Sequence, residues 1–276
     1  MGLLEGRVAF ITGGARGQGR SHAVALASEG CDIALFDIAA DISVVPYDLA
    51  RPADLAETAR MVENEGRRCL SVVGDVRHSK VVNDAVAQTV RELGGLDIVI
   101  ANAGVLHYTT VENCTDQAWD AVLSTNLTGE FNVLRAAIPH LKRQGFGRII
   151  TVSSTAGRSA SPNLPHYVAA KWGVIGLTKA LALEMAGTGI TVNTICPGTL
   201  ASGIFYHDAT ARLFMPDNPH ATVDDLKSLS TNNGLTQFPI LEPEHVTRAV
   251  MYLVLDPGVL TGQVVEVGNG KTATLT

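Results

Sequence analysis

The sequence predicts an α/β fold in which one doubly wound parallel sheet of seven strands is covered by helices on both faces. Short β-branched runs alternate with longer stretches of helical periodicity, which is the rhythm of repeated strand–helix–strand units. The runs are apolar nearly throughout instead of alternating with polar residues, as expected of parallel strands buried on both sides. A chain of 276 residues is of ordinary length for a single domain of this kind.

The elements follow in order along the chain. The predicted strands begin at Arg7, Cys31, Cys69, Leu96, Gly147, Ile190 and Gln263. The predicted helices cover 18–29, 53–66, 79–93, 116–143, 167–186 and 243–255. Two segments, 39–52 and 199–241, exceed the few residues usual for connections in such a sheet. We expect the first to be an insert on the cofactor side and the second to be a substrate lid, both within a single domain over 1–276.

Composition and charge exclude several classes of protein. The net charge is −6 and no run of Lys or Arg is present, so nucleic acid is not an expected partner. The N-terminus carries Glu5 where a signal peptide is positive, and no segment reaches eighteen apolar residues, so a cytoplasmic protein without a membrane partner is expected. The four cysteines and eight histidines lack ligand spacing, which predicts buried free thiols and no metal.

A glycine-rich turn, TGGARGQG from Thr12, follows the first predicted strand. Glycines at Gly13, Gly17 and Gly19 allow a tight turn and let the backbone approach a pyrophosphate at the N-terminus of the next helix. Such turns also arise for steric reasons alone. The position between an apolar strand and an amphipathic helix favours a dinucleotide site.

Asp37, at the end of the second predicted strand, bears on the choice of dinucleotide. A carboxylate here can accept hydrogen bonds from the adenosine ribose and would repel a 2′-phosphate. Arg16 in the glycine turn favours NADP instead, unless it is a solvated surface residue. Because apolar Ile38 leaves no second basic residue beside the ribose, NAD is the predicted cofactor.

Tyr167 and Lys171 are spaced i, i+4, so on a helix they share a face and can converge on one ligand. A core tyrosine with a solvated lysine would give the same spacing. Ser154 stands thirteen residues before Tyr167. The spacing alone therefore does not decide between a functional pair and ordinary helix packing, and the rest of the chain must.

Further motifs accompany these residues in order along nearly the whole chain: Asp75-Val76, ANAG from Ala101, Asn126 and Pro197-Gly198. With the glycine turn, Ser154 and YVAAK from Tyr167, the pattern resembles the classical short-chain dehydrogenase/reductase family. The resemblance implies a Rossmann fold and hydride transfer between a nicotinamide cofactor and an alcohol or ketone. The stretches GQGRSHA, VPYDLARPADLAETARMVE and PHYVAAKWGVIGL are similar to the mycofactocin-associated, carveol-dehydrogenase-like subfamily. That similarity implies tightly bound NAD, and NAD that is retained would need an external redox acceptor.

The resemblance places a catalytic tetrad on Asn126, Ser154, Tyr167 and Lys171. Tyr167 would be the general base, or the acid in the reverse direction. A free phenol has a pKa of about 10, so a base of this kind needs a nearby cation to stabilise the phenolate, and Lys171 would supply it. Ser154 would hydrogen-bond the substrate oxygen. Asn126 would interrupt its helix and hold a water that connects Lys171 to solvent.

The glycine turn, Asp37 and the resemblance together predict a set of cofactor contacts, with Asp75 and Val76 at the adenine and Pro197 and Gly198 near the nicotinamide. The predicted set is Gly13, Arg16, Gly17, Gln18, Gly19, Asp37, Ile38, Asp75, Val76, Asn102, Ala103, Gly104, Tyr167, Lys171, Pro197, Gly198, Leu200 and Ser202. The chain departs from the family pattern twice. Ser202 replaces the usual threonine, and the last strand ends in VGNG, which puts a C-terminal subunit contact in doubt.

The lid segment is mostly apolar, which predicts a small hydrophobic secondary alcohol or its ketone, cyclic or terpenoid like carveol. The candidate substrate contacts are Ser154, Tyr167, His107, Phe205, Tyr206 and Phe214, although half of the apolar lid residues would only pack and His107 is equally an ordinary surface residue.

Two other readings of the same residues remain open. They are an NAD(P)H-dependent ketoreductase of a biosynthetic pathway and a non-catalytic NAD-binding sensor on this fold. The family resemblance implies a homotetramer, or else a dimer, assembled through the helices at 116–143 and 167–186.

Overall fold

A seven-stranded parallel sheet forms the centre of the described part of the chain, with strand order β3-β2-β1-β4-β5-β6-β7. The computed structural model describes residues 2–215, 217–229, 240–268 and 270. The strands are β1 Val8–Thr12, β2 Asp32–Asp37, β3 Cys69–Val73, β4 Ile98–Ala101, β5 Gly147–Val152, β6 Ile190–Pro197 and β7 Val264–Val267. The predicted doubly wound sheet is confirmed. The chain reverses its winding between β1 and β4, where ligand crevices form in such sheets.

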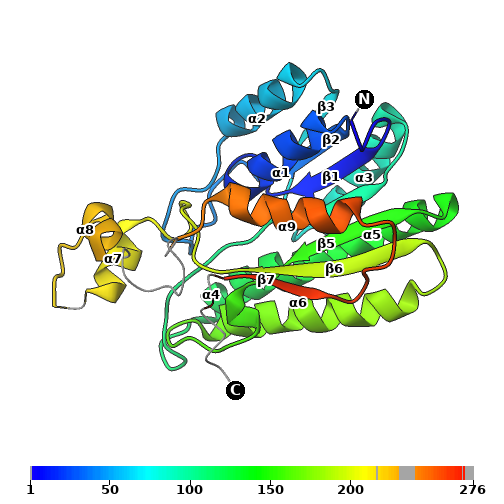
Figure 1. Cartoon of the computed structure of the whole chain (residues 1–276). Helices are drawn as coiled ribbons and strands as arrows, with labels where there is room; N and C mark the ends of the chain where they lie inside the picture. The colour runs from blue at the N-terminus through cyan, green and yellow to red at the C-terminus, as the bar shows by residue number, and fades with distance from the viewer. Residues whose placement is uncertain (1, 216, 230–239, 269, 271–276) are drawn as a thin grey trace.

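Helices cover both faces of the sheet (Figure 1). On one face lie α1 Gly17–Ser28, α2 Pro52–Asn64 and α9 Pro243–Leu255, and on the other lie α3 Ser79–Leu93, α5 Gly129–Gln144 and α6 Pro165–Glu184. Alternate residues of β1 enter the two cores: Ala9 and Ile11 pack with the first group, Val8 and Phe10 with the second. The central strands are therefore apolar on both faces, as the sequence predicts, while the edge strands β3 and β7 are only partly covered.

The single helix predicted over 116–143 is broken by a wider turn. The segments are α4 Asp116–Leu123, the π-helical turn η1 Ser124–Thr128 and then α5. Single π-turns inside α-helices are frequent at functional sites. Asn126 lies in the middle of this turn, so the expected local interruption of the helix is present.

The predicted lid at 199–241 contains two short helices, α7 Asp208–Phe214 and α8 Val223–Leu229, which project from the body of the molecule (Figure 1). Phe205, Tyr206 and Met215 pack on a small cluster formed by Ala211, Ala221 and Leu226. The lid thus has a hydrophobic centre of its own. Residues 216 and 230–239 of the predicted lid, and Asn269 of the VGNG sequence, lie outside the described residues.

Across the described ranges, no helix is long and apolar enough to cross a membrane. Within the same ranges, no three His, Cys, Asp or Glu side chains gather as metal ligands would. All four cysteines are free thiols, as predicted, but only Cys31 and Cys196 are buried. Cys69 lies on the edge strand β3 and Cys114 in the loop before α4, which leaves both partly exposed.

Candidate active site

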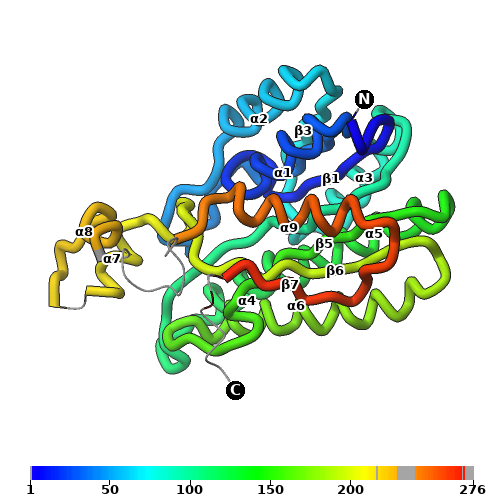
Figure 2. Tube along the Cα trace, in the orientation of Figure 1, coloured from blue at the N-terminus to red at the C-terminus, as the bar shows by residue number. Residues whose placement is uncertain are grey.

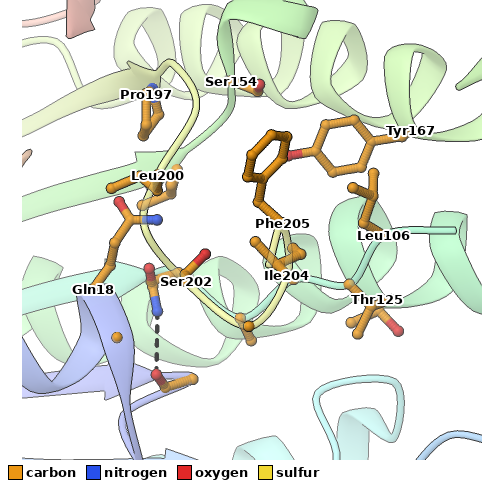
Figure 3. Close-up of a pocket in the computed structure, with 18 of the residues that line it drawn as sticks. Gln18, Leu106, Thr125, Ser154, Tyr167, Pro197, Leu200, Ser202, Ile204 and Phe205 are labelled. Carbon is orange, nitrogen blue, oxygen red and sulfur yellow. Dashed lines mark hydrogen bonds between the residues drawn. The ribbon is translucent and has the colours of Figure 1, made fainter. Parts of the chain in front are cut away.

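A cavity of about 720 Å³ opens at the carboxyl ends of the strands, beside the point where the winding reverses. Its walls combine the glycine turn, the loops after β2 to β6, the start of α6 and the lid (Figure 3). Every predicted cofactor residue except Gly19 lines this cavity, and so do Ser154, Phe205 and Phe214. Residues from six strand ends thus meet around one space, as the order of the sheet requires.

The glycine turn depends on backbone that only glycine adopts easily. Gly13 has φ 65° and Gly17 has φ 56°. A Cβ atom on Gly13 would also stand 2.9 Å from Nδ2 of Asn102. Gly19 does not line the cavity, and its lack of a Cβ lets the first turn of α1 approach the carbonyl oxygen of Gly13. The turn therefore leaves its amide groups free of side chains at the start of a helix, where an anion is favoured.

Asp37 holds this turn from the neighbouring strand. Its buried carboxylate accepts hydrogen bonds from the backbone N–H groups of Ala15 and Ala39, each at 3.0 Å. Arg16 also lines the cavity, and its guanidinium donates to the carbonyl oxygen of Asp48 in the insert. The choice of NAD therefore depends on the Asp37 carboxylate and not on Arg16.

Tyr167 and Lys171 share one face of α6, with the Lys171 ammonium nitrogen 5.8 Å from the centre of the tyrosine ring. The ammonium donates to the carbonyl oxygen of Val152 at 2.6 Å and is buried. The two neighbouring serines have different partners. Both line the cavity, but Ser153 donates to the backbone carbonyl of Lys171 at 2.7 Å, whereas Ser154 caps the short helix η2 Thr155–Gly157. The hydroxyl hydrogen of Ser153 is thus used within the protein, which favours Ser154, the serine with the predicted offset, as the substrate contact.

The fully buried Asn126 side chain is used by the loop after β4. Its Oδ1 accepts from the N–H of Val105 at 2.7 Å, and its Nδ2 donates to the carbonyl of the same residue at 2.8 Å. This pair fixes the loop beside Gly104, where an added Cβ would lie 3.7 Å from the Lys171 nitrogen. The Asn126 side chain thus fixes the loop after β4 at the cavity. The predicted water between Asn126 and Lys171 stays a prediction.

The insert at 39–52 reaches further than the sequence suggests. Tyr47 accepts a hydrogen bond from the N–H of Leu106 at 2.9 Å and stacks on His207 of the lid with ring centres 4.8 Å apart. The insert and the lid run at the same end of the molecule (Figure 2). Ile42 and Leu49 of the insert belong to the same apolar cluster as Tyr167. The insert therefore joins the predicted adenosine side of the cavity to the catalytic side.

Two predicted substrate contacts lie elsewhere. His107 does not line the cavity; its ring packs edge-on against His166 at 5.7 Å between centres, and burial lowers its pKa. Tyr206 packs against Phe205 and Lys227 inside the lid and also does not line the cavity. His107 was chosen as a polar residue near the site and Tyr206 as an apolar residue of the lid, and neither signal determines where a loop side chain points.

Two tyrosines of the cavity wall were missed by the sequence analysis. Tyr47 and Tyr108 both line the cavity, and both pack near His207. Burial raises the pKa of Tyr108 to about 12, so this phenol stays protonated at neutral pH. The signal available was an aromatic residue in a loop that follows a strand, Tyr47 after β2 and Tyr108 after β4, because such side chains usually pack against an apolar partner.

The cavity fits a dinucleotide on chemical grounds. The side-chain oxygens Oε1 of Gln18 and Oγ of Ser202 line it, are buried and have no hydrogen-bond partner among the described residues. Buried polar atoms without partners are rare, because each costs about 1–3 kcal/mol. The pair, together with the bare backbone of the glycine turn, suits a polar, anionic ligand that extends from the turn toward β6.

Comparison with known proteins agrees with this geometry. A family model described as short chain dehydrogenase matches residues 7–211. The (-)-trans-carveol dehydrogenase of Rhodococcus erythropolis is 38% identical over 275 residues, which cover 99% of each chain. The solved structure of carveol dehydrogenase from Mycobacterium avium in complex with NAD has a TM-score of 0.95 at 39% identity, over 99% of this chain and 100% of that one.

A second solved structure, a short chain dehydrogenase from Mycobacterium paratuberculosis bound to NAD, has a TM-score of 0.90 at 38% identity, over 99% of this chain and 100% of the other. The likeness to carveol dehydrogenases inferred from the motifs is thus confirmed, while the association with mycofactocin stays a prediction. Because the family model covers most of the chain and the relatives match it from end to end, this chain belongs to the short chain dehydrogenase family.

Proposed function

We propose that this oxidoreductase transfers hydride between NAD and a small hydrophobic secondary alcohol or its ketone, with a cyclic or terpenoid alcohol such as carveol as the preferred class. The observation that carries the proposal is the meeting of Tyr167, Lys171 and Ser154 at one cavity beside the glycine turn. The names of the relatives, which include carveol dehydrogenases and NAD complexes, agree with it.

The residues divide the work of alcohol oxidation. NAD, when bound, supplies the nicotinamide ring that accepts the hydride. Tyr167 takes the hydroxyl proton, and Lys171, held by the Val152 carbonyl, stabilises the phenolate that does so. Ser154 donates a hydrogen bond to the substrate oxygen and so orients the reacting carbon.

The walls near Tyr167 support a hydrophobic substrate. Leu106, Ile204 and Phe205 lie around Tyr167 in the cavity (Figure 3), and Phe214 lines it from α7. Apolar walls with a few convergent polar groups are typical of sites for small organic ligands. A substrate with a free carboxylate or phosphate would lose hydration against these apolar walls on binding.

The test of the proposal is a panel of secondary alcohols, with carveol included, incubated with NAD and purified protein. NADH formation is expected with cyclic and terpenoid alcohols and not with alcohols that carry a carboxylate. Parallel reactions with the alcohols contain a redox dye, because retained NAD would need an external acceptor. Separate reactions with ketones and NADH measure the reverse direction. A failure of both panels, with and without the dye, would contradict the proposal and favour the NAD-binding sensor.

The contacts of the insert support a second part of the proposal, that NAD is held tightly. Tyr47 joins the insert to Leu106 and to His207 of the lid, so cofactor release requires these contacts to open. We expect purified wild-type protein to retain NAD through gel filtration, as measured by mass spectrometry. Tyr47→Ala should retain less, whereas Tyr252→Ala, at an exposed tyrosine of α9, should match the wild type. Wild-type protein that is free of cofactor and exchanges NAD rapidly would rule this part out.

The predicted homotetramer and cytoplasmic location also belong to this proposal. Phe131 of α5 and Trp172 and Leu183 of α6 are exposed apolar side chains on the helices where the resemblance places the subunit contacts. Large exposed apolar side chains on neighbouring helices are typical of surfaces that a partner covers. Light scattering on the purified protein measures the assembly.

A further inference from the structure

Glu130 is a buried acid that the proposed mechanism does not use. It lies in the first turn of α5, four residues after Asn126, and its side chain is 2% exposed. Its Oε1 stands 3.5 Å from the Lys171 nitrogen, and neither carboxyl oxygen has a hydrogen-bond partner among the described residues. A fully buried acid is rarely kept without good partners, because its burial costs free energy in either protonation state.

Lys171 is the charged group that faces this carboxyl. The turn η1 and strand β4, which pack on α5, contain no acidic or basic residue. Most other charged side chains on the neighbouring elements have partners elsewhere: Arg135 on Asn132, Arg143 on His140, Lys80 on Asp84, Arg91 on Glu92, and Arg148 on the carbonyl of Asp256. Lys142 of α5 and Lys179 and Glu184 of α6 are exposed to solvent. The charge of Glu130 therefore acts chiefly on Lys171.

We propose that Glu130 is a positioning residue that adjusts the positive field of Lys171 at Tyr167 and so sets the pH range over which the enzyme oxidises alcohols. The inference deepens the proposed function and rests on it, because it acts through the base assigned there. A carboxylate 3.5 Å from the ammonium cancels part of the field that stabilises the phenolate, whereas a neutral carboxylic acid leaves that field intact.

The pH at which Glu130 ionises determines when its charge opposes that of Lys171. Burial raises the pKa of Glu130 to about 8, and the nearby Lys171 opposes that rise. Below this pH the acid is neutral and Lys171 acts on Tyr167 at full strength. As the pH rises through it, the carboxylate forms and opposes the ionisation of Tyr167. The ionisations of Glu130 and Tyr167 are therefore coupled. The rate of alcohol oxidation should rise over a wider pH interval than the ionisation of a single group would give.

The test compares wild type with Glu130→Gln, which keeps the shape of the side chain and removes its charge. The midpoint of the rate rise should move to lower pH by about one unit, the size expected for a unit charge roughly 10 Å away at an effective dielectric constant near 20. The pH interval over which the rate rises should also narrow to that of a single ionising group. Glu130→Met, which removes the polar group as well, should shift the same way if Glu130→Gln does not fold.

A direct reading of Tyr167 separates this inference from the proposed function. Phenolate absorbance is titrated in the protein as purified, with any cofactor that it retains, and the contribution of Tyr167 is obtained by subtracting the Tyr167→Phe variant. The midpoint of this Tyr167 titration should shift in the Glu130 variants even if no tested alcohol reacts. Asp97→Asn, which breaks a buried carboxylate's pairing with Arg7 at the far end of β4, is the matched control and should lower stability without moving the titration. An unchanged midpoint in both Glu130 variants would overturn the inference while leaving the proposed function standing.

Discussion

Replacing Tyr167 by phenylalanine is expected to lower kcat for alcohol oxidation by about 10²–10⁴-fold, the usual contribution of a positioned general base. The change removes one oxygen and keeps the ring that packs with Val105 and the insert. Affinity for NAD should therefore change by less than about threefold. Initial rates of NADH formation and calorimetric titration of NAD measure the two effects.

The control for this variant is Tyr252→Phe, which makes the same chemical change at an exposed position on α9 and should leave the rate unchanged. A Tyr167→Phe enzyme that keeps more than a tenth of the wild-type rate would show that another group takes the hydroxyl proton. Tyr108, which also lines the cavity, would be the next group to test.

Replacing Gly19 by alanine is expected to weaken NAD binding by at least about tenfold, or about 1.4 kcal/mol. The added Cβ would overlap the carbonyl oxygen of Gly13, so either the glycine turn or the start of α1 must move. The turn amides would then no longer point at a bound pyrophosphate. Thermal unfolding should also occur at a lower temperature, because the turn packs on the buried Asp37.

Gly176→Ala is the matched control for the turn variant. Gly176 also lies in a helix, but a Cβ there meets nothing within 4 Å. Alanine is the better helix former by roughly 1 kcal/mol, so this variant should bind NAD normally and be equally or more stable. If Gly19→Ala bound NAD as tightly as Gly176→Ala, the turn would not be the phosphate site.

The fold and the centre of the site could be predicted because their signals are local or periodic. Buried parallel strands must be apolar, a turn such as Gly13 to Gly19 needs glycine, and residues four apart on a helix must share a face. The choice of Ser154 followed from its offset to Tyr167 and stays a prediction, which the hydrogen bond from Ser153 to the Lys171 backbone favours.

The parts that could not be predicted depend on contacts between distant loops. Nothing in the sequence near Tyr47 reveals that its ring stacks on His207, because the pairing depends on how two long loops cross the cavity. His107 and Tyr206 were assigned to the cavity on sequence position, and both turn away from it. Glu130 reads as an ordinary polar residue of a helix until the packing of α5 against Lys171 is seen.

Asp37 ties coenzyme choice to folding. The same carboxylate that would exclude a 2′-phosphate also receives the amides of Ala15 and Ala39, the second of which has an unfavourable φ of 48°. A substitution that admitted NADP and also removed both acceptor oxygens would therefore remove two supports of the first loop. Coenzyme choice and the stability of this loop are thus linked at one residue.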